Sequence, residues 1–144
     1  MNLFGMLEIS GSALTAERQR AEVVVSNMAN AQTTHTPQGG PYRRQLVVFR
    51  ARQAPQFPAL LASMGTPAMR MVRVERVAPD ASPPIERYQP GHPDADAKGY
   101  VAYPAIDPVA EMADLLGAAR AYGLNASAIQ AAKNMILQSL DILR

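Results

Sequence analysis

Three side chains that could bind a divalent metal stand close together in the segment HPDAD. They are His92, Asp94 and Asp96, and an imidazole with two carboxylates suits a hard or borderline cation. Pro93 stiffens the chain beside His92, however, and no second histidine is nearby. We therefore interpret the segment as a turn in which Asp94 and Asp96 bond nearby backbone amides. A metal-dependent hydrolase is the weakest alternative.

The rest of the sequence offers no arrangement typical of an enzyme. His35 lies in a loop rich in threonine, proline and glycine, and no serine–histidine–acid set or carboxylate pair has a catalytic spacing. Gly39-Gly40 is followed by Pro41 rather than by a helix, which argues against a phosphate cradle. Cysteine is absent, so no disulfide framework or thiolate metal site can form. We predict that the protein is not an enzyme and has no cofactor.

The middle of the chain is basic. Eight arginines and three acidic residues lie in the range 43–87. Arginines such as Arg43-Arg44 could face phosphates, but aromatic residues for stacking on single strands are few, with Tyr42 and Phe49 beside them. The net charge of +2 is too small to indicate nucleic-acid binding by itself. We expect a protein partner, and the alternative function is a basic binding module for nucleic acid or an acidic surface through Arg43–Arg87.

Proline divides the chain into two ends and a middle. All 12 prolines lie between Pro37 and Pro108. Because proline costs about 3 kcal/mol or more in a helix interior, each end can form a long helix. With 48% hydrophobic and 18% charged residues, the 144-residue chain is too apolar to be disordered throughout. No stretch reaches the roughly 20 apolar residues of a membrane span, and Glu8 stands where a cleaved signal would be apolar.

Both ends carry apolar residues at the spacing of a coiled-coil seam. The N-terminal stripe consists of Leu3, Leu7, Ser10, Leu14, Glu17, Ala21, Val24 and Met28. The C-terminal stripe consists of Val109, Met112, Leu116, Ala119, Gly123, Ala126, Ile129, Lys133, Ile136, Leu140 and Leu143. Asp107 is a good N-cap, and Pro108 suits the first helical position. We expect these helices to be largely disordered in the free monomer, because isolated helices are marginal in water.

The middle favours short strands and turns. Strands are predicted at Gln45–Arg50 and Met69–Val77, and a loop at Gln53–Pro67. The predicted fold class is mainly α: antiparallel N- and C-terminal long helices, forming a coiled-coil hairpin, with a small β-rich insert. The predicted parts are the N-terminal helix in residues 1–36, the β-rich insert in residues 37–106 and the C-terminal helix in residues 107–144.

Three stretches together resemble the flagellar rod and hook axial protein family. The first is a helix with Ser10-Gly11 near its start that ends in SNMANAQTT, and the second is THTPQGGPYRRQLVVF, similar to a segment peculiar to the proximal rod. The third runs from SPPIERYQPGHPDADAKGYVAYPAID into EMADLLGAARAYGLN. Together they cover most of the chain, while Gln53–Val72 fits poorly. Ala105 and Gly123 depart from the family's pattern, which affects local capping and helix rigidity.

The resemblance implies a structural subunit of the bacterial flagellar basal-body rod. Such a subunit would pass through the flagellar type III export apparatus without signal cleavage. It would then polymerise in the periplasm with copies of itself and other rod proteins, next to ring components of the basal body, and transmit torque. The resemblance implies no nucleic-acid partner and no direct membrane span.

Two groups of residues are the candidate sites. The apolar group is predicted to pack the helices and carry assembly: Leu7, Leu14, Val24, Leu116, Ile136 and Leu140. The polar group matches the family's motif and is expected to make polar contacts at helix ends or between subunits: Asn27, Asn30, Arg120, Tyr122 and Asn125.

Overall fold

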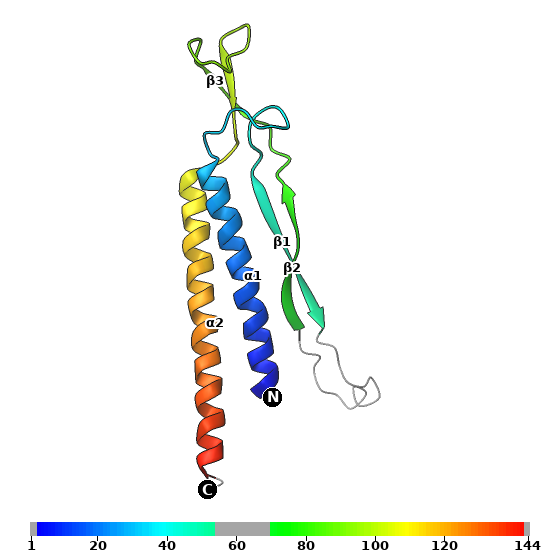
Figure 1. The fold of residues 1–144 in the computed structure, drawn as a ribbon, viewed down its shortest axis with the longest axis vertical. Helices are drawn as coiled ribbons and strands as arrows, with labels where there is room; N and C mark the ends of the chain where they lie inside the picture. The colour runs from blue at the N-terminus through cyan, green and yellow to red at the C-terminus, as the bar shows by residue number, and fades with distance from the viewer. Residues whose placement is uncertain (1–2, 54–69, 143–144) are drawn as a thin grey trace. The chain divides into compact units, whose positions relative to one another are not determined.

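The computed structural model describes residues 3–53 and 70–142. The elements follow in the order α1 (Leu3–Ala29), β1 (Gln45–Gln53), β2 (Arg70–Pro79), β3 (Ile85–Tyr88), β4 (Tyr100–Tyr103) and α2 (Pro108–Ile142) (Figure 1). β1 and β2 form one two-stranded sheet, and β3 and β4 form another. Apart from Gln53, the predicted loop at Gln53–Pro67 lies outside the described residues.

The ends of the two helices follow from local hydrogen bonds. The Asp107 carboxylate accepts the Val109 N–H at 2.9 Å, and the Asp107 carbonyl accepts the Glu111 N–H at 3.0 Å. This confirms Asp107 as the N-cap of α2. α1 ends where the Asn30 side chain donates to the Ser26 carbonyl at 2.9 Å. Neither helix is long and apolar enough to cross a membrane, as far as their described residues go.

The strands are only partly those expected. β1 and β2 overlap the predicted segments Gln45–Arg50 and Met69–Val77. β3 and β4 were not predicted as strands, because each has only four residues and prolines flank β3 closely on both sides. They pair antiparallel, with Ile85 opposite Tyr103 and Tyr88 opposite Tyr100.

The described chain forms two compact units. The first unit takes its residues from Met1–Gln19, Val48–Arg76 and Ala118–Arg144, and the second from Arg20–Val47 and Val77–Gly117. In the second unit the last turns of α1 contact the first turns of α2, where Arg20 is 3.0 Å from Asp114.

In each unit a polar side chain of α1 bonds the backbone of a strand. In the first unit the Ser12 hydroxyl accepts the Val72 N–H of β2 at 3.2 Å. In the second unit the Asn27 side chain bonds both the N–H and the C=O of Gln45 in β1. Unpaired strand edges invite association with other chains, so these side chains cover backbone groups that would otherwise be open.

The predicted coiled-coil hairpin is wrong. About half of the described residues are helical, and the two sheets are separate elements rather than one small insert. On α2 the fully buried positions are Glu111, Ala118 and Ala132, whereas Leu116 and Leu140 of the predicted seam are more than half exposed. The buried face of α2 therefore carries small side chains and one carboxylate. Alanines repeat along the helix beside the larger residues, and a face of small side chains permits closer packing of the helix.

Candidate functional site

A buried amide organises the second unit. Asn27, in the last turn of α1, is 1% exposed. Its Nδ2 donates to the Gln45 carbonyl at 2.9 Å and to Glu111 Oε2 at 3.1 Å. Its Oδ1 accepts the Gln45 N–H at 2.8 Å and the Tyr42 hydroxyl at 3.2 Å. An amide side chain has two donors and two acceptor positions, so Asn27 uses its full capacity to join α1, β1 and α2.

Glu111 and Arg44 continue this network. Glu111 lies in the first turn of α2 and is 1% exposed. Arg44 Nε donates to Glu111 Oε1 at 2.6 Å, so both carboxylate oxygens have a partner. A buried charge is tolerated only when it is paired and hydrogen-bonded. Glu111 is therefore a structural anchor, and its position near the helix N-terminus favours the negative charge.

Arg44 also reaches two further carboxylates. Its guanidinium nitrogens lie 3.8 Å from Asp80 Oδ2 and 3.8 Å from Asp114 Oδ2, and Arg20 lies 3.0 Å from the other oxygen of Asp114. The six side chains that form this network are called the polar junction below: Arg20, Asn27, Arg44, Asp80, Glu111 and Asp114.

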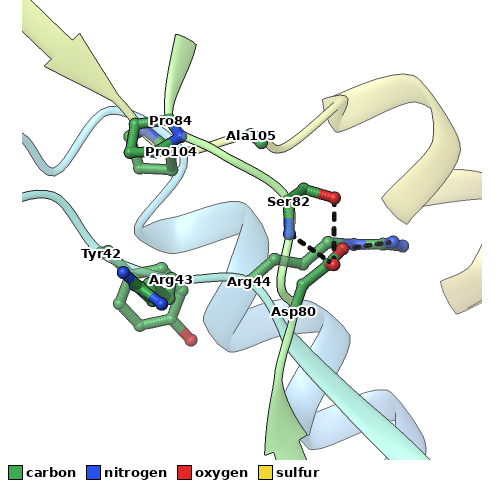
Figure 2. A pocket seen from close by; sticks show the side chains of 8 residues that line it. All are labelled: Tyr42, Arg43, Arg44, Asp80, Ser82, Pro84, Pro104 and Ala105. Atoms are coloured by element: carbon green, nitrogen blue, oxygen red, sulfur yellow. Dashed lines mark hydrogen bonds and ion pairs between the residues drawn. The ribbon is translucent and has the colours of Figure 1, made fainter.

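The Asp80 carboxyl of the polar junction is made more acidic by its hydrogen bonds. Its Oδ1 accepts the Ser82 N–H and the Ser82 hydroxyl, each at 3.0 Å (Figure 2). These two bonds lower the pKa of Asp80 below its ordinary value of 3.8, burial opposes them, and the Arg44 charge adds a smaller lowering effect. The shallow recess beside them, lined also by Tyr42 and Pro104, has room for about one water molecule.

The remaining polar motif residues lie elsewhere. Asn30 closes the end of α1, and Thr33 donates to its side chain at 3.2 Å. Asn125 donates to the carbonyl of Ala121 within α2 at 2.8 Å. Arg120 and Tyr122 are exposed on α2. Of the predicted polar group, the structure thus brings only Asn27 and Asn30 to the same helix end.

The apolar candidates differ widely in burial. Val24 is buried, and Leu7, Leu14 and Ile136 are half-buried. Leu116 and Leu140 are exposed on α2. Their role in assembly stays a prediction.

The HPDAD segment is a turn held by its own side chains. Asp96 Oδ1 accepts the backbone N–H groups of Lys98 and Tyr100, each at 2.8 Å, as predicted. Asp94 instead accepts the Thr34 hydroxyl at 2.7 Å, and His92 Nδ1 accepts the Asp94 N–H at 3.1 Å. Within the described ranges, no three histidine, aspartate or glutamate side chains are grouped as metal ligands.

Sequence reasoning missed the central residues of the polar junction. The basic pattern of the sequence indicates Arg44 only for binding a phosphate or an acidic surface, and it assigns Glu111 no partner. One signal could have identified Glu111. It lies seven residues before Ala118 and 21 residues before Ala132, so the three residues share one face of α2, and that face is buried. A charge at such a position requires a cationic partner, and the sequence does not identify which arginine provides it.

Comparisons with known proteins identify the family of the chain. Residues 97–142 match the family model for the C-terminal part of flagellar basal body rod FlgEFG proteins. The flagellar basal-body rod protein FlgC of Borreliella burgdorferi is 38% identical and aligns with 100% of this chain and 99% of its own length. The FlgC proteins of Escherichia coli and Bacillus subtilis are 40% and 39% identical, over 99% of this chain and 98% and 99% of their own lengths. The chain belongs to the FlgC family of flagellar basal-body rod proteins.

Proposed function

We propose that this chain is a structural subunit of the flagellar basal-body rod that polymerises with other rod subunits and transmits torque. The observation that carries the proposal is the similarity to FlgC proteins along nearly the whole of both chains. Such a subunit would bear and transmit mechanical load. The ion pairs of the polar junction would make the second unit more rigid under that load.

The surface of α2 supports a role in assembly. Among the described residues of α2, eight large hydrophobic or aromatic side chains are exposed: Val109, Met112, Leu116, Tyr122, Leu124, Met135, Leu137 and Leu140. Exposed apolar surface of this kind is typical of a protein that binds other proteins. In the assembled rod these side chains would be covered by neighbouring subunits, including copies of this chain.

The remaining details of the proposal follow from the rod role. The subunit would act in the periplasm beside ring components of the basal body, after export through the flagellar type III apparatus without a cleaved signal. It would catalyse no reaction. The mechanical role supports this, as do the structural hydrogen bonds of Asp94 to Thr34 and of Asp96 to the backbone of its own turn.

Substitution of Leu140 tests the proposal. Leu140→Asp should leave the folding of the free chain unchanged within about 0.5 kcal/mol, because the side chain is exposed. It should abolish rod formation, because an unpaired charge would be buried between subunits. The measurements are secretion of the chain, electron microscopy of basal bodies and swimming in a strain lacking its own copy.

The matched control is Gln138→Asp, which adds the same charge at an exposed position two residues away. It should secrete, assemble and swim almost normally. Normal rods and swimming with Leu140→Asp would contradict the proposed assembly surface.

A further inference from the structure

The sheet of β1 and β2 has an open edge in the first unit. α1 lies at the edge of β2, where Ser12 accepts the Val72 N–H at 3.2 Å. β1 is the other strand of this two-stranded sheet. From Val48 to Arg52, the backbone of β1 has no hydrogen bond to a described residue outside the sheet. Within the described part of the chain, the outer edge of β1 therefore has backbone donors and acceptors without partners in this range.

The charge beside this edge is strongly positive. Arg50 is paired with Glu75 at 2.5 Å. Arg52, Arg70 and Arg73 are exposed, and no ion pair joins them to another described residue. β1 contains no proline. A proline would lack the backbone N–H needed for pairing with an added strand.

We propose that the outer edge of β1 binds an extended, acidic segment of another protein as a third strand. Backbone hydrogen bonds would supply affinity, as in other cases of strand addition. Acidic side chains at alternate positions of the added strand would lie next to Arg50 and Arg52, since residues of neighbouring strands that share a face approach closely. A third strand would also strengthen a sheet that is marginal with two.

This interaction surface is independent of the proposed assembly surface on α2. The opposing interpretation is that Arg50 and Arg52 only protect the edge from aggregation, as charged residues do on many edge strands. The experiment must therefore separate strand pairing from simple attraction between charges.

The probes are three fluorescent eight-residue peptides: one alternating valine and glutamate, one with lysine in place of glutamate, and the glutamate peptide with alternate backbone nitrogens methylated. They are titrated into the full-length chain, with trimethylamine N-oxide added until circular dichroism shows the helix content of the fold, since this osmolyte favours the compact state. Binding is followed by fluorescence anisotropy and by amide shifts in β1. The glutamate peptide should bind about tenfold or more tightly than either of the other two.

The variant Arg52→Glu should weaken binding of the glutamate peptide about tenfold or more, whereas Lys98→Glu, which makes the same charge change in the HPDAD turn, should have little effect. Equal binding of the methylated peptide would overturn strand addition and leave only charge attraction. No binding of the glutamate peptide to the folded chain would show that the arginines only protect the edge. Neither result would affect the rod proposal, which is tested separately by Leu140→Asp.

Discussion

Asn27 is the residue on which the second unit most depends. Its side-chain amide donates to the Gln45 carbonyl and accepts the Gln45 N–H, and it also donates to the Glu111 carboxylate. Asn27→Ala leaves these buried groups without partners, so we expect a loss of about 2–4 kcal/mol in folding free energy. The measurement is an osmolyte folding titration followed by circular dichroism.

The control for that substitution is Asn125→Ala. Among the described residues, the Asn125 side chain bonds only the carbonyl of Ala121, one turn earlier in the same helix. Asn125→Ala should lower the free energy of unfolding by less than about 1 kcal/mol. Alanine has a high helix propensity, and the Ala121 carbonyl lies inside the helix, where it already accepts a backbone hydrogen bond. Equal effects of the two substitutions would show that the bonds between elements add nothing to stability.

Asp80 makes the second unit sensitive to acid. Because its pKa is lowered in the folded state by Ser82 and Arg44, its carboxylate stabilises the fold above its ordinary pKa of 3.8. That contribution is lost as the pH falls through this value toward the lowered pKa. The difference in stability between the native chain and Asp80→Asn should therefore be largest near neutral pH and shrink through this window. Sucrose-driven folding at a series of pH values measures it.

Ser82→Ala is the matched control for this pH dependence. It removes the hydroxyl bond to Asp80 and keeps the backbone bond. The pH-dependent difference should become smaller without disappearing. A difference that stays constant from neutral to acid pH would contradict the assigned role of Asp80.

At the scale of elements, the hairpin of β3 and β4 depends on Gly99. Its φ is 81°, and a Cβ added there would lie 2.9 Å from Tyr88 Cε2 and 3.1 Å from Pro90 Cβ. Gly99→Ala should therefore cost about 1–2 kcal/mol for the left-handed backbone alone, and more for the displaced ring. Nuclear magnetic resonance spectra would detect this destabilisation as a loss of the amide signals characteristic of β3 and β4.

Gly91→Ala is the control in the same hairpin, because an added Cβ there meets nothing within 4 Å. It should leave the β3 and β4 signals in place. If both substitutions were equally tolerated, the close approach of Tyr88 to Gly99 would not constrain the hairpin.

The two helices and the strands β1 and β2 were predictable, whereas their packing was not. The absence of proline, the Asp107 cap and the β-branched residues at Gln45–Arg50 are local signals that act within one element. Which face of α2 is buried does not follow from a local signal. Ala118 and Leu116 both lie on repeating stripes, and only the packing of the helix determines which of the two stripes is buried. For the same reason the pairing of Arg44 with Glu111, 67 residues apart, could not be predicted from spacing.

At the scale of the whole molecule, few apolar residues are fully buried. Among the described residues they are Ala16, Val24, Val101, Ile106, Ala118 and Ala132, half of which are alanine. A small core offsets little of the conformational entropy lost on folding, which is about 1–2 kcal/mol per residue for the backbone. The exposed large apolar residues of α2, such as Leu116 and Leu140, would contribute more if neighbouring subunits covered them, as the proposed assembly surface requires.

We therefore predict that most of α1 and α2 is disordered in the free, dilute chain and folds on assembly. Isolated helices are marginal in water even when they are rich in alanine, and most of their stability comes from packing. Circular dichroism in plain buffer should show a weak helical signal that rises with osmolyte, and amide hydrogen exchange in both helices should be fast. The Leu140→Asp chain should behave in the same way, because Leu140 is exposed without neighbours. Strong helical signal with protected amides throughout α1 and α2 at low concentration would show instead that the polar junction and the alanine stripe suffice to hold the helices before any neighbour arrives.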